Sequence, residues 1–280
     1  MQRFIRLFII QVFIVLLSSA SSQAVQLRYN LAVGQSYAYD CTIAEEGITG
    51  LNIGGQTRNM TTRTDGKIGM VMTVKELTAR DTFLVETLFD AFSLKISALG
   101  QSTYLPPSAG LKGKKMVVEM DRRGKLTKLE TPAFQVPDIF MSADSLLENV
   151  LPSLPAADIQ PGQKWETIRR VPLPQGGSIN AAIAYTFKGQ LNVDGTEYYK
   201  IESVIDIPLD MASSSSITSA KAGAGEKYVV KTSTLYETTT MMPVRIDSST
   251  KVVTKIDDLQ SGGATSTDMD IKATILKRKK

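Results

Sequence analysis

Residues 67–75, Lys-Ile-Gly-Met-Val-Met-Thr-Val-Lys, decide the fold class, because every second side chain is apolar, at positions 68, 70, 72 and 74, while Lys67, Thr73 and Lys75 lie among the other positions. Alternation with period two is typical of a β-strand, whose successive side chains point to opposite faces. The same pattern returns in most of the chain after residue 24, at residues 82–89, 178–187, 227–234, 242–256 and 269–275. The sequence therefore predicts a mainly β protein.

Tight turns separate several of these stretches. Asp194-Gly195 stands between two alternating runs, where a type I′ hairpin turn needs positive φ at both central residues. Asp121-Arg122-Arg123-Gly124 joins two further runs, with Gly124 expected in a left-handed conformation. Strands closed by such turns form antiparallel meanders.

One segment follows a helical pattern. Ile139, Ala143, Leu146, Leu147 and Val150 have the spacing of an apolar helix stripe. Asp138 can cap the first turn, and the prolines at 152 and 155 end the pattern. We expect one amphipathic helix over residues 138–151, whose apolar stripe either fills the core or covers a cavity.

A weak internal repeat suggests the domain organisation. Val33-Gly34-Gln35-Ser36-Tyr37 resembles Pro161-Gly162-Gln163-Lys164-Trp165, and residues 113–118 resemble residues 225–230. These matches predict two related antiparallel β-meanders with a half-barrel-like form, residues 25–136 and 162–280, joined by the helix and a Pro-rich connector at 137–161. Residues 47–65 and 212–225, rich in small and polar residues, are expected to be long loops.

The first 24 residues have the pattern of a secretory signal peptide. Arg3 and Arg6 precede an apolar run, and Ser22-Gln23-Ala24 fits the cleavage pattern. We expect an exported protein, periplasmic or extracellular, with no transmembrane span after signal cleavage, because no later stretch is long and apolar enough.

The charge balance argues against nucleic acid as a partner. Without Arg3 and Arg6 the 32 basic residues fall to 30 against 28 acidic ones, a net charge of +2. The basic tail Lys277-Arg278-Lys279-Lys280 is expected to be a solvated, frayed end, with contact to an anionic lipid or polymer as the alternative.

The residue types present exclude several kinds of chemistry. The chain has no histidine and one cysteine, Cys41, which removes His-dependent nucleophilic catalysis, His-liganded zinc and disulfides within the chain. Cys41 is expected to be a buried strand residue. Glu45 and Glu46 would point to opposite faces of a strand, while Asp268 and Asp270 would share a face but lack a calcium-loop pattern.

Aromatic and methionine side chains allow two interpretations. Trp165 and several tyrosines suit either a stacking platform for sugars or ordinary cross-strand packing, which we favour. The methionines suit an adaptable cavity for acyl chains or an ordinary core. No catalytic, cofactor-binding or metal-ligating residue is therefore assigned, no cofactor is expected, and we expect a protein that is not an enzyme.

The signal peptide, the antiparallel strands and a helix able to cover an open sheet resemble bacterial exported envelope proteins of the LolA/LppX type. The opening Leu27-Arg28-Tyr29-Asn30-Leu31, followed by Gly34-Gln35 and Tyr37, is also similar to uncharacterised exported β-rich proteins. The resemblance is architectural, covers residues 25–276 and carries no specific motif or lipid-attachment cysteine. It implies a β half-barrel whose concave face holds lipid.

Three functions remain in view. The first is an envelope protein that binds or carries an apolar or amphiphilic ligand such as a lipid. The second is a structural or interaction module of the cell envelope with a protein partner, using an apolar patch or a bare sheet edge. The third is a hydrolase that uses two carboxylates about 5–10 Å apart.

Overall fold

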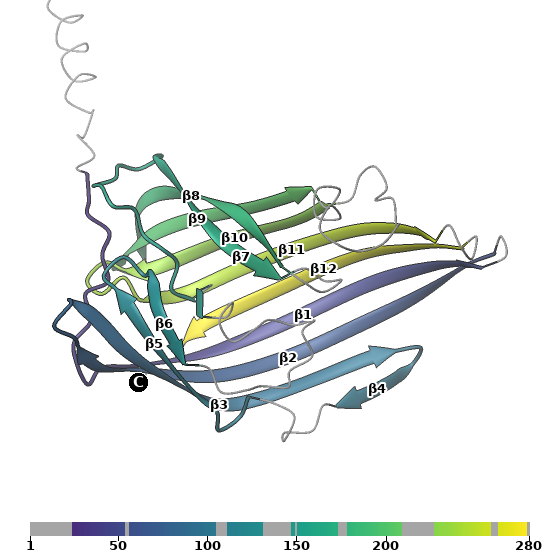
Figure 1. The fold of residues 1–280 in the computed structure, drawn as a ribbon, viewed down its shortest axis with the longest axis horizontal. Helices are drawn as coiled ribbons and strands as arrows, with labels where there is room; N and C mark the ends of the chain where they lie inside the picture. The colour runs from purple at the N-terminus through teal and green to yellow at the C-terminus, as the bar shows by residue number, and fades with distance from the viewer. Residues whose placement is uncertain are drawn as a thin grey trace, which may run out of the picture.

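The computed structural model describes residues 24–53, 56–104, 111–130, 147–148, 150–172, 178–208, 227–258 and 263–278. Twelve antiparallel strands form one sheet, which confirms the prediction of a mainly β protein (Figure 1). The strands are β1 (Ser36–Ile53), β2 (Gln56–Leu77), β3 (Thr82–Ala98), β4 (Gln101–Tyr104), β5 (Lys115–Asp121), β6 (Leu126–Glu130), β7 (Lys164–Pro172), β8 (Ser178–Val193), β9 (Thr196–Pro208), β10 (Lys227–Glu237), β11 (Pro243–Asp258) and β12 (Gly263–Lys277).

The two halves of the chain form the two halves of this one sheet. The strand order is β6-β5-β3-β2-β1-β12-β11-β10-β9-β8-β7, with β4 paired to β3 outside it. The halves meet where β1 pairs with β12, from Tyr39 opposite Lys277 to Asn52 opposite Ala264. Apart from this central pair, every strand within that order lies beside a strand that is close in sequence, as expected for meanders. A common origin of the halves, and the segment boundaries given above, remain predictions.

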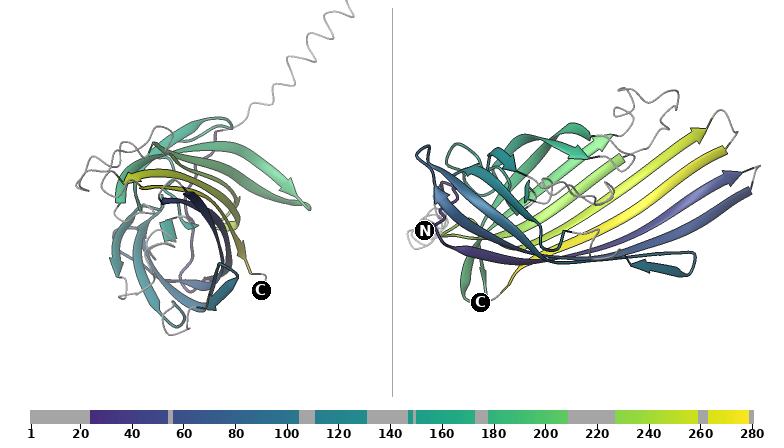
Figure 2. Two further views of the ribbon diagram at one scale, coloured as in Figure 1. Left: turned by 90° about the vertical axis from the view of Figure 1, so that its right-hand side faces the viewer. Right: turned by 60° about the horizontal axis from the view of Figure 1, so that its bottom comes forward.

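The sheet is curled at one end and open at the other (Figure 2). Long strands from the middle of the sheet, among them β1, β2, β11 and β12, run from the curled end into the open end. Strong twist and coiling of this kind are normal in large antiparallel sheets. The curl gives the sheet an inner and an outer face.

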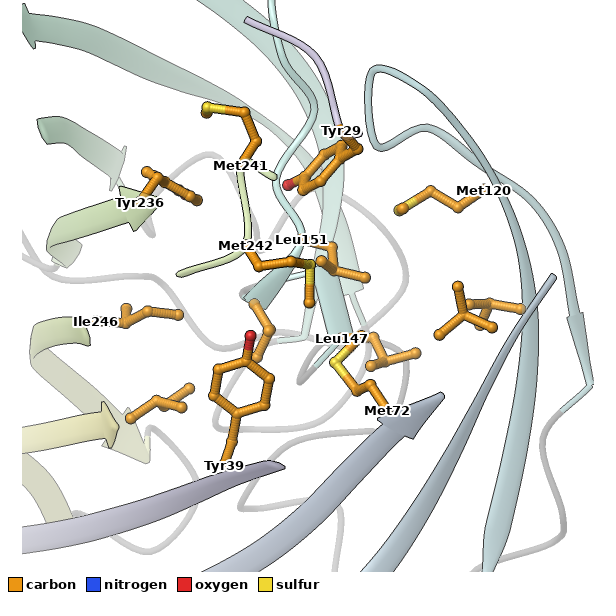
Figure 3. Packing of buried hydrophobic residues seen from close by; sticks show 14 of the residues in the cluster. Tyr29, Tyr39, Met72, Met120, Leu147, Leu151, Tyr236, Met241, Met242 and Ile246 are labelled. Carbon is orange, nitrogen blue, oxygen red and sulfur yellow. The ribbon is translucent and has the colours of Figure 1, made fainter. Parts of the chain in front are cut away.

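Alternating side chains of the strands build the core on the inner face. Tyr39, Met72, Tyr236 and Ile246 point into it from four strands (Figure 3). Met70, on the same face of β2 as Met72, is fully buried as well, as the spacing of residues 67–75 predicted. Burial of these large apolar side chains is the main source of stability for a chain without disulfides.

Two segments without strand structure fill the curled end, and we call them the plug: residues 25–31 and the described residues of 147–160. An isolated bridge joins Val25 to Ile159. The hydroxyl of Tyr29 donates a hydrogen bond to the Pro152 carbonyl at 3.1 Å, and the amide of Leu154 donates to the Arg123 carbonyl at 2.7 Å. The plug therefore closes one end of the curled sheet with buried apolar side chains.

Most of the predicted helix at 138–151 lies outside the described residues, so it stays a prediction. At its C-terminal end, Leu147, Glu148 and Val150 have helical backbone, and the Leu151 amide donates to the Leu147 carbonyl at 2.7 Å. Leu147, Val150 and Leu151 are buried in the core.

The two Gly-Gln motifs are built alike. Gly34 and Gly162 have φ of 84° and 86°. Each glycine amide donates to a carbonyl on a neighbouring strand, Val74 or Phe187, and the same residue's amide returns a hydrogen bond to the glutamine carbonyl. A third turn, before β5, repeats this exchange between Gly113, Lys114 and Phe89. Each turn thus starts the strand that follows it in register with its neighbour.

Two expectations about irregular segments are wrong. Residues 47–65 are not a long loop, because β1 and β2 run through them and pair up to Ile53 opposite Gln56. The basic tail is not frayed at its start, since Lys277 contacts Glu237 and Arg278 binds Asp40 and Asp90. The loop expected at 212–225, like the signal peptide up to residue 23, lies outside the described residues.

Candidate functional site

Apolar side chains continue on the inner face beyond the plug, where some are buried, among them Ile205, Ile207 and Val252, and others are only half-buried. They come from neighbouring strands and follow the registers Ile43 opposite Ala273, Glu45 opposite Ile271, and Gly47 opposite Met269. Strands β9 to β11 continue these rows across the sheet. The half-buried apolar members are Ile43, Tyr228, Val230, Met269 and Ile271.

Hydroxyl side chains interrupt this apolar surface in one row. Ser203, Thr232 and Ser248 lie side by side on β9, β10 and β11, according to the strand registers. The hydroxyls of Thr232 and Ser248 share a hydrogen bond of 3.2 Å, and all three residues are half-buried. The surface therefore offers neutral hydrogen-bonding groups next to apolar ones.

Glu45 is a carboxylate on the inner face. Its side chain is 7% exposed, whereas Glu46 is exposed, so the expected opposite orientation of this pair is confirmed. Burial raises the pKa of the Glu45 carboxyl, and a hydrogen bond from Thr64 lowers it again in part. Its place was readable from the sequence, because Glu45 shares the strand period of Tyr39 and Cys41.

A basic group lies near the plug, where Arg169 of β7 forms an ion pair with Glu148 at 3.3 Å. Both residues line a cavity of about 30 Å³ between the plug and β8–β10. A cavity of this size has room for a water molecule and not for an acyl chain. Among the described residues, the inner face therefore offers a half-open surface rather than a closed apolar cavity.

A larger hollow of about 720 Å³ lies at the curled end of the sheet, lined by Tyr37, Tyr198 and Glu237 among others. Its charged groups are paired with one another or with neighbours. Lys277 binds Glu237 and lies over the Tyr37 ring, with its ammonium 5.0 Å from the ring centroid. Burial and the nearby Glu237 carboxylate raise the pKa of Tyr37 to about 12.

The residues singled out in the sequence have packing roles. Trp165 stacks on Tyr185 at 5.0 Å between ring centroids and donates a hydrogen bond from Nε1 to the Ser153 carbonyl at 3.0 Å. Cys41 is buried in β1, and that burial raises the pKa of its thiol to about 12. Both preferred interpretations are confirmed.

The acidic pair considered for calcium lies on the outer face, where Asp268 pairs with Lys251 at 3.4 Å. Within the parts of the chain that the structure describes, no three acidic or cysteine side chains gather as a metal site would require.

No protein family model matches the chain, and no curated protein sequence matches it. Its fold is similar to that of lipovitellin, with 10% identity and a TM-score of 0.52. The lipovitellin structure is described as one of lipid-protein interactions. The match covers 89% of this chain and 26% of the lipovitellin chain, so this chain spans about a quarter of that protein's length. At this identity the likeness establishes the fold alone.

Two bacterial structures also match. One is a DUF1329 family protein from Desulfovibrio piger, with 12% identity, 84% of each chain covered and a TM-score of 0.17. The other is a domain assigned to outer membrane lipoprotein sorting from Vibrio parahaemolyticus, with 9% identity, 84% of each chain covered and a TM-score of 0.14. The resemblance expected from the sequence is thus found again among solved structures, without a specific motif.

The described part of the chain has no helix with the length and apolar character that crossing a membrane requires.

Proposed function

We propose that this protein is an exported envelope protein that binds an apolar or amphiphilic ligand, such as a lipid, on the inner face of its sheet. One observation carries the proposal: the apolar rows of the inner face continue past the plug, and several of their side chains are only half-buried there. An apolar surface left partly open on a concave face is typical of ligand sites. The proposal assigns no catalytic chemistry to the chain.

The chemistry of this surface favours an amphiphile. Ile271, Met269 and Val230 offer apolar contact, while the hydroxyl row and Glu45 offer hydrogen bonds beside it. The fold likeness to lipovitellin, whose structure was determined for its lipid-protein interactions, supports a lipid as the apolar part. The described strands leave the sheet open at its far end (Figure 2), which suits chains of different length.

The first test is native mass spectrometry of the protein purified from its own envelope, followed by organic extraction. The proposal expects an added mass that disappears on extraction and is recovered as a lipid or another amphiphile. A bare protein mass in every preparation, together with no binding of a fluorescent long-chain fatty acid, would refute it.

A pair of variants locates the site. Ile271→Lys places a charge among the half-buried apolar side chains of the inner face, and it should weaken binding of the fluorescent fatty acid by roughly tenfold. Ile168→Lys is the matched control, since Ile168 on the outer face of β7 is 79% exposed and should bind as the wild type does. Equal binding by both variants would exclude the inner face.

One observation favours the alternative, a structural or interaction module of the envelope. In the described sheet β7 is a terminal strand of nine residues, and it carries the exposed Ile168. A terminal strand can accept a strand from a partner protein. A bare mass in the first test, with a protein that co-purifies in the wild type and is lost in Ile168→Lys, would support this function instead.

A further inference from the structure

Three lysines surround a hollow of about 390 Å³ on the outer face of the sheet, opposite the proposed lipid surface. Lys67 comes from β2, Lys95 from β3 and Lys272 from β12. Small side chains form the floor between them, because Thr42 and Ala44 of β1 stand between Lys67 and Lys272 in the strand register. Three cations therefore frame a depression whose floor between the strands of Lys67 and Lys272 consists of small side chains.

These three lysines form no close ion pair in the described sheet, although Asp65 stands opposite Lys95 in the strand register. Among the described residues, none of the three has a carboxylate within ion-pair distance, whereas Lys75, Lys115 and Lys251 each have one. Asp65, the acidic residue that lines the hollow, is already bound by Arg63 through two contacts of 3.2 Å. The hollow thus keeps an excess of positive charge.

One of the three lysines lies beside an aromatic ring at the rim of the hollow. The ammonium of Lys95 lies 5.8 Å from the centroid of the Tyr104 ring, on the neighbouring β4. Lys67 and Lys272 stand two strand spacings apart, roughly 10 Å across the sheet, so that flexible side chains of both can reach one ligand between them.

We propose that this hollow binds a phosphate-bearing ligand, with Lys67, Lys95 and Lys272 as its cationic contacts. Lysine ammonium groups bind phosphate oxygens with short, charge-assisted hydrogen bonds. The larger hollow near Tyr37 does not suit such a ligand, because its lysine and glutamate neutralise each other. The site is independent of ligand binding on the inner face.

The test compares two triple variants of the full chain. Lys67→Gln/Lys95→Gln/Lys272→Gln removes the three contacts. Lys125→Gln/Lys164→Gln/Lys227→Gln removes the same net charge from exposed lysines elsewhere. Titration calorimetry with glycerol 3-phosphate should show binding by the wild type and the control variant, and affinity weaker by roughly tenfold or more in the hollow variant.

Flotation with vesicles distinguishes the source of the phosphate. If the ligand is a lipid headgroup, the wild type and the control variant float with phosphatidylglycerol vesicles and not with phosphatidylcholine vesicles, while the hollow variant does not float. If the ligand is soluble, flotation is absent and the calorimetric difference remains. Equal losses in the two triple variants, or no binding of either probe by the wild type, would overturn the proposal.

Discussion

The guanidinium of Arg278 joins two strands of the first half of the chain to the end of the last strand. It donates hydrogen bonds to both carboxylate oxygens of Asp90 at 2.6 and 2.8 Å, and to Asp40 at 2.8 Å. It also donates to the Tyr39 carbonyl at 3.0 Å. A side chain in a tail that the sequence predicted to be solvated thus stabilises the sheet across β1, β3 and β12.

Arg278→Gln should lower the free energy of unfolding by about 1–3 kcal/mol, because it removes charge-assisted hydrogen bonds from a partly shielded site. Arg63→Gln is the control, since its pair with Asp65 is more exposed and its loss should lower the free energy of unfolding much less. Urea unfolding measures both. Equal, small effects would show that the contacts of Arg278 are not stabilising.

The same contact predicts a dependence on pH. Hydrogen bonds from Arg278, and its positive charge, hold the pKa of Asp90 below its usual value. A carboxyl with a lowered folded-state pKa adds stability above its unfolded-state pKa and loses it as the pH falls through the folded-state value. The difference between wild type and Arg278→Gln should therefore stay constant above about pH 5 and shrink toward pH 3.

Among the elements, the Asp121–Gly124 turn fixes the plug against the sheet. Gly124 has a φ of 82°, and a Cβ there would lie 2.5 Å from the Pro152 carbonyl oxygen and 2.7 Å from the Tyr29 ring. Gly195 in the β8–β9 turn has the same φ and open space around it. Both positions therefore need a residue that tolerates positive φ, and only Gly124 also lacks space for a side chain.

Gly195→Ala should cost about 1–2 kcal/mol of unfolding free energy, because alanine disfavours positive φ. Gly124→Ala should cost about 1–3 kcal/mol more, because the plug must also move to admit the methyl group. Thermal unfolding of both variants gives the comparison. Equal losses would mean that the plug adapts freely at this turn.

Turns of this kind were predictable from the sequence because their signals are local. Asp194 and Gly195 both have positive φ, as the hairpin signal required, and Gly124 is left-handed as expected. The expectation of a loop at residues 47–65 was wrong for the opposite reason. Their glycines and threonines have weak local preference for a strand. Pairing with β12, far away in the sequence, holds residues 47–52 extended, and β2 in turn pairs with β1 and β3.

At the scale of the whole molecule, the pairing of β1 with β12 decides the architecture and leaves no local signal. Cys41 stands opposite Ile275, although strands β2 to β11 lie between them in the sequence. The same limit applies to the sites. Period two was enough to predict that Glu45 and Glu46 point to opposite faces, but the lysine hollow assembles β2, β3 and β12, which only the strand order brings together.

One shared sheet predicts that the two halves unfold together. Met70→Ala in β2 removes a fully buried side chain and should cost about 2–5 kcal/mol. Trp165, the only tryptophan, lies in β7 of the other half, so its fluorescence reports on a region distant in sequence from the change. Val33→Ala is the control, because Val33 is 58% exposed.

If the sheet is one cooperative unit, the fluorescence of Trp165 and the far-ultraviolet circular dichroism of Met70→Ala shift to the same lower urea midpoint, while the control keeps the wild-type midpoint. Halves that fold independently would give a different result: the Trp165 transition would stay at the wild-type midpoint, and the circular dichroism would separate into two steps. Coincident transitions would therefore show that the two halves of the chain, which meet at the β1–β12 pair, unfold as one unit.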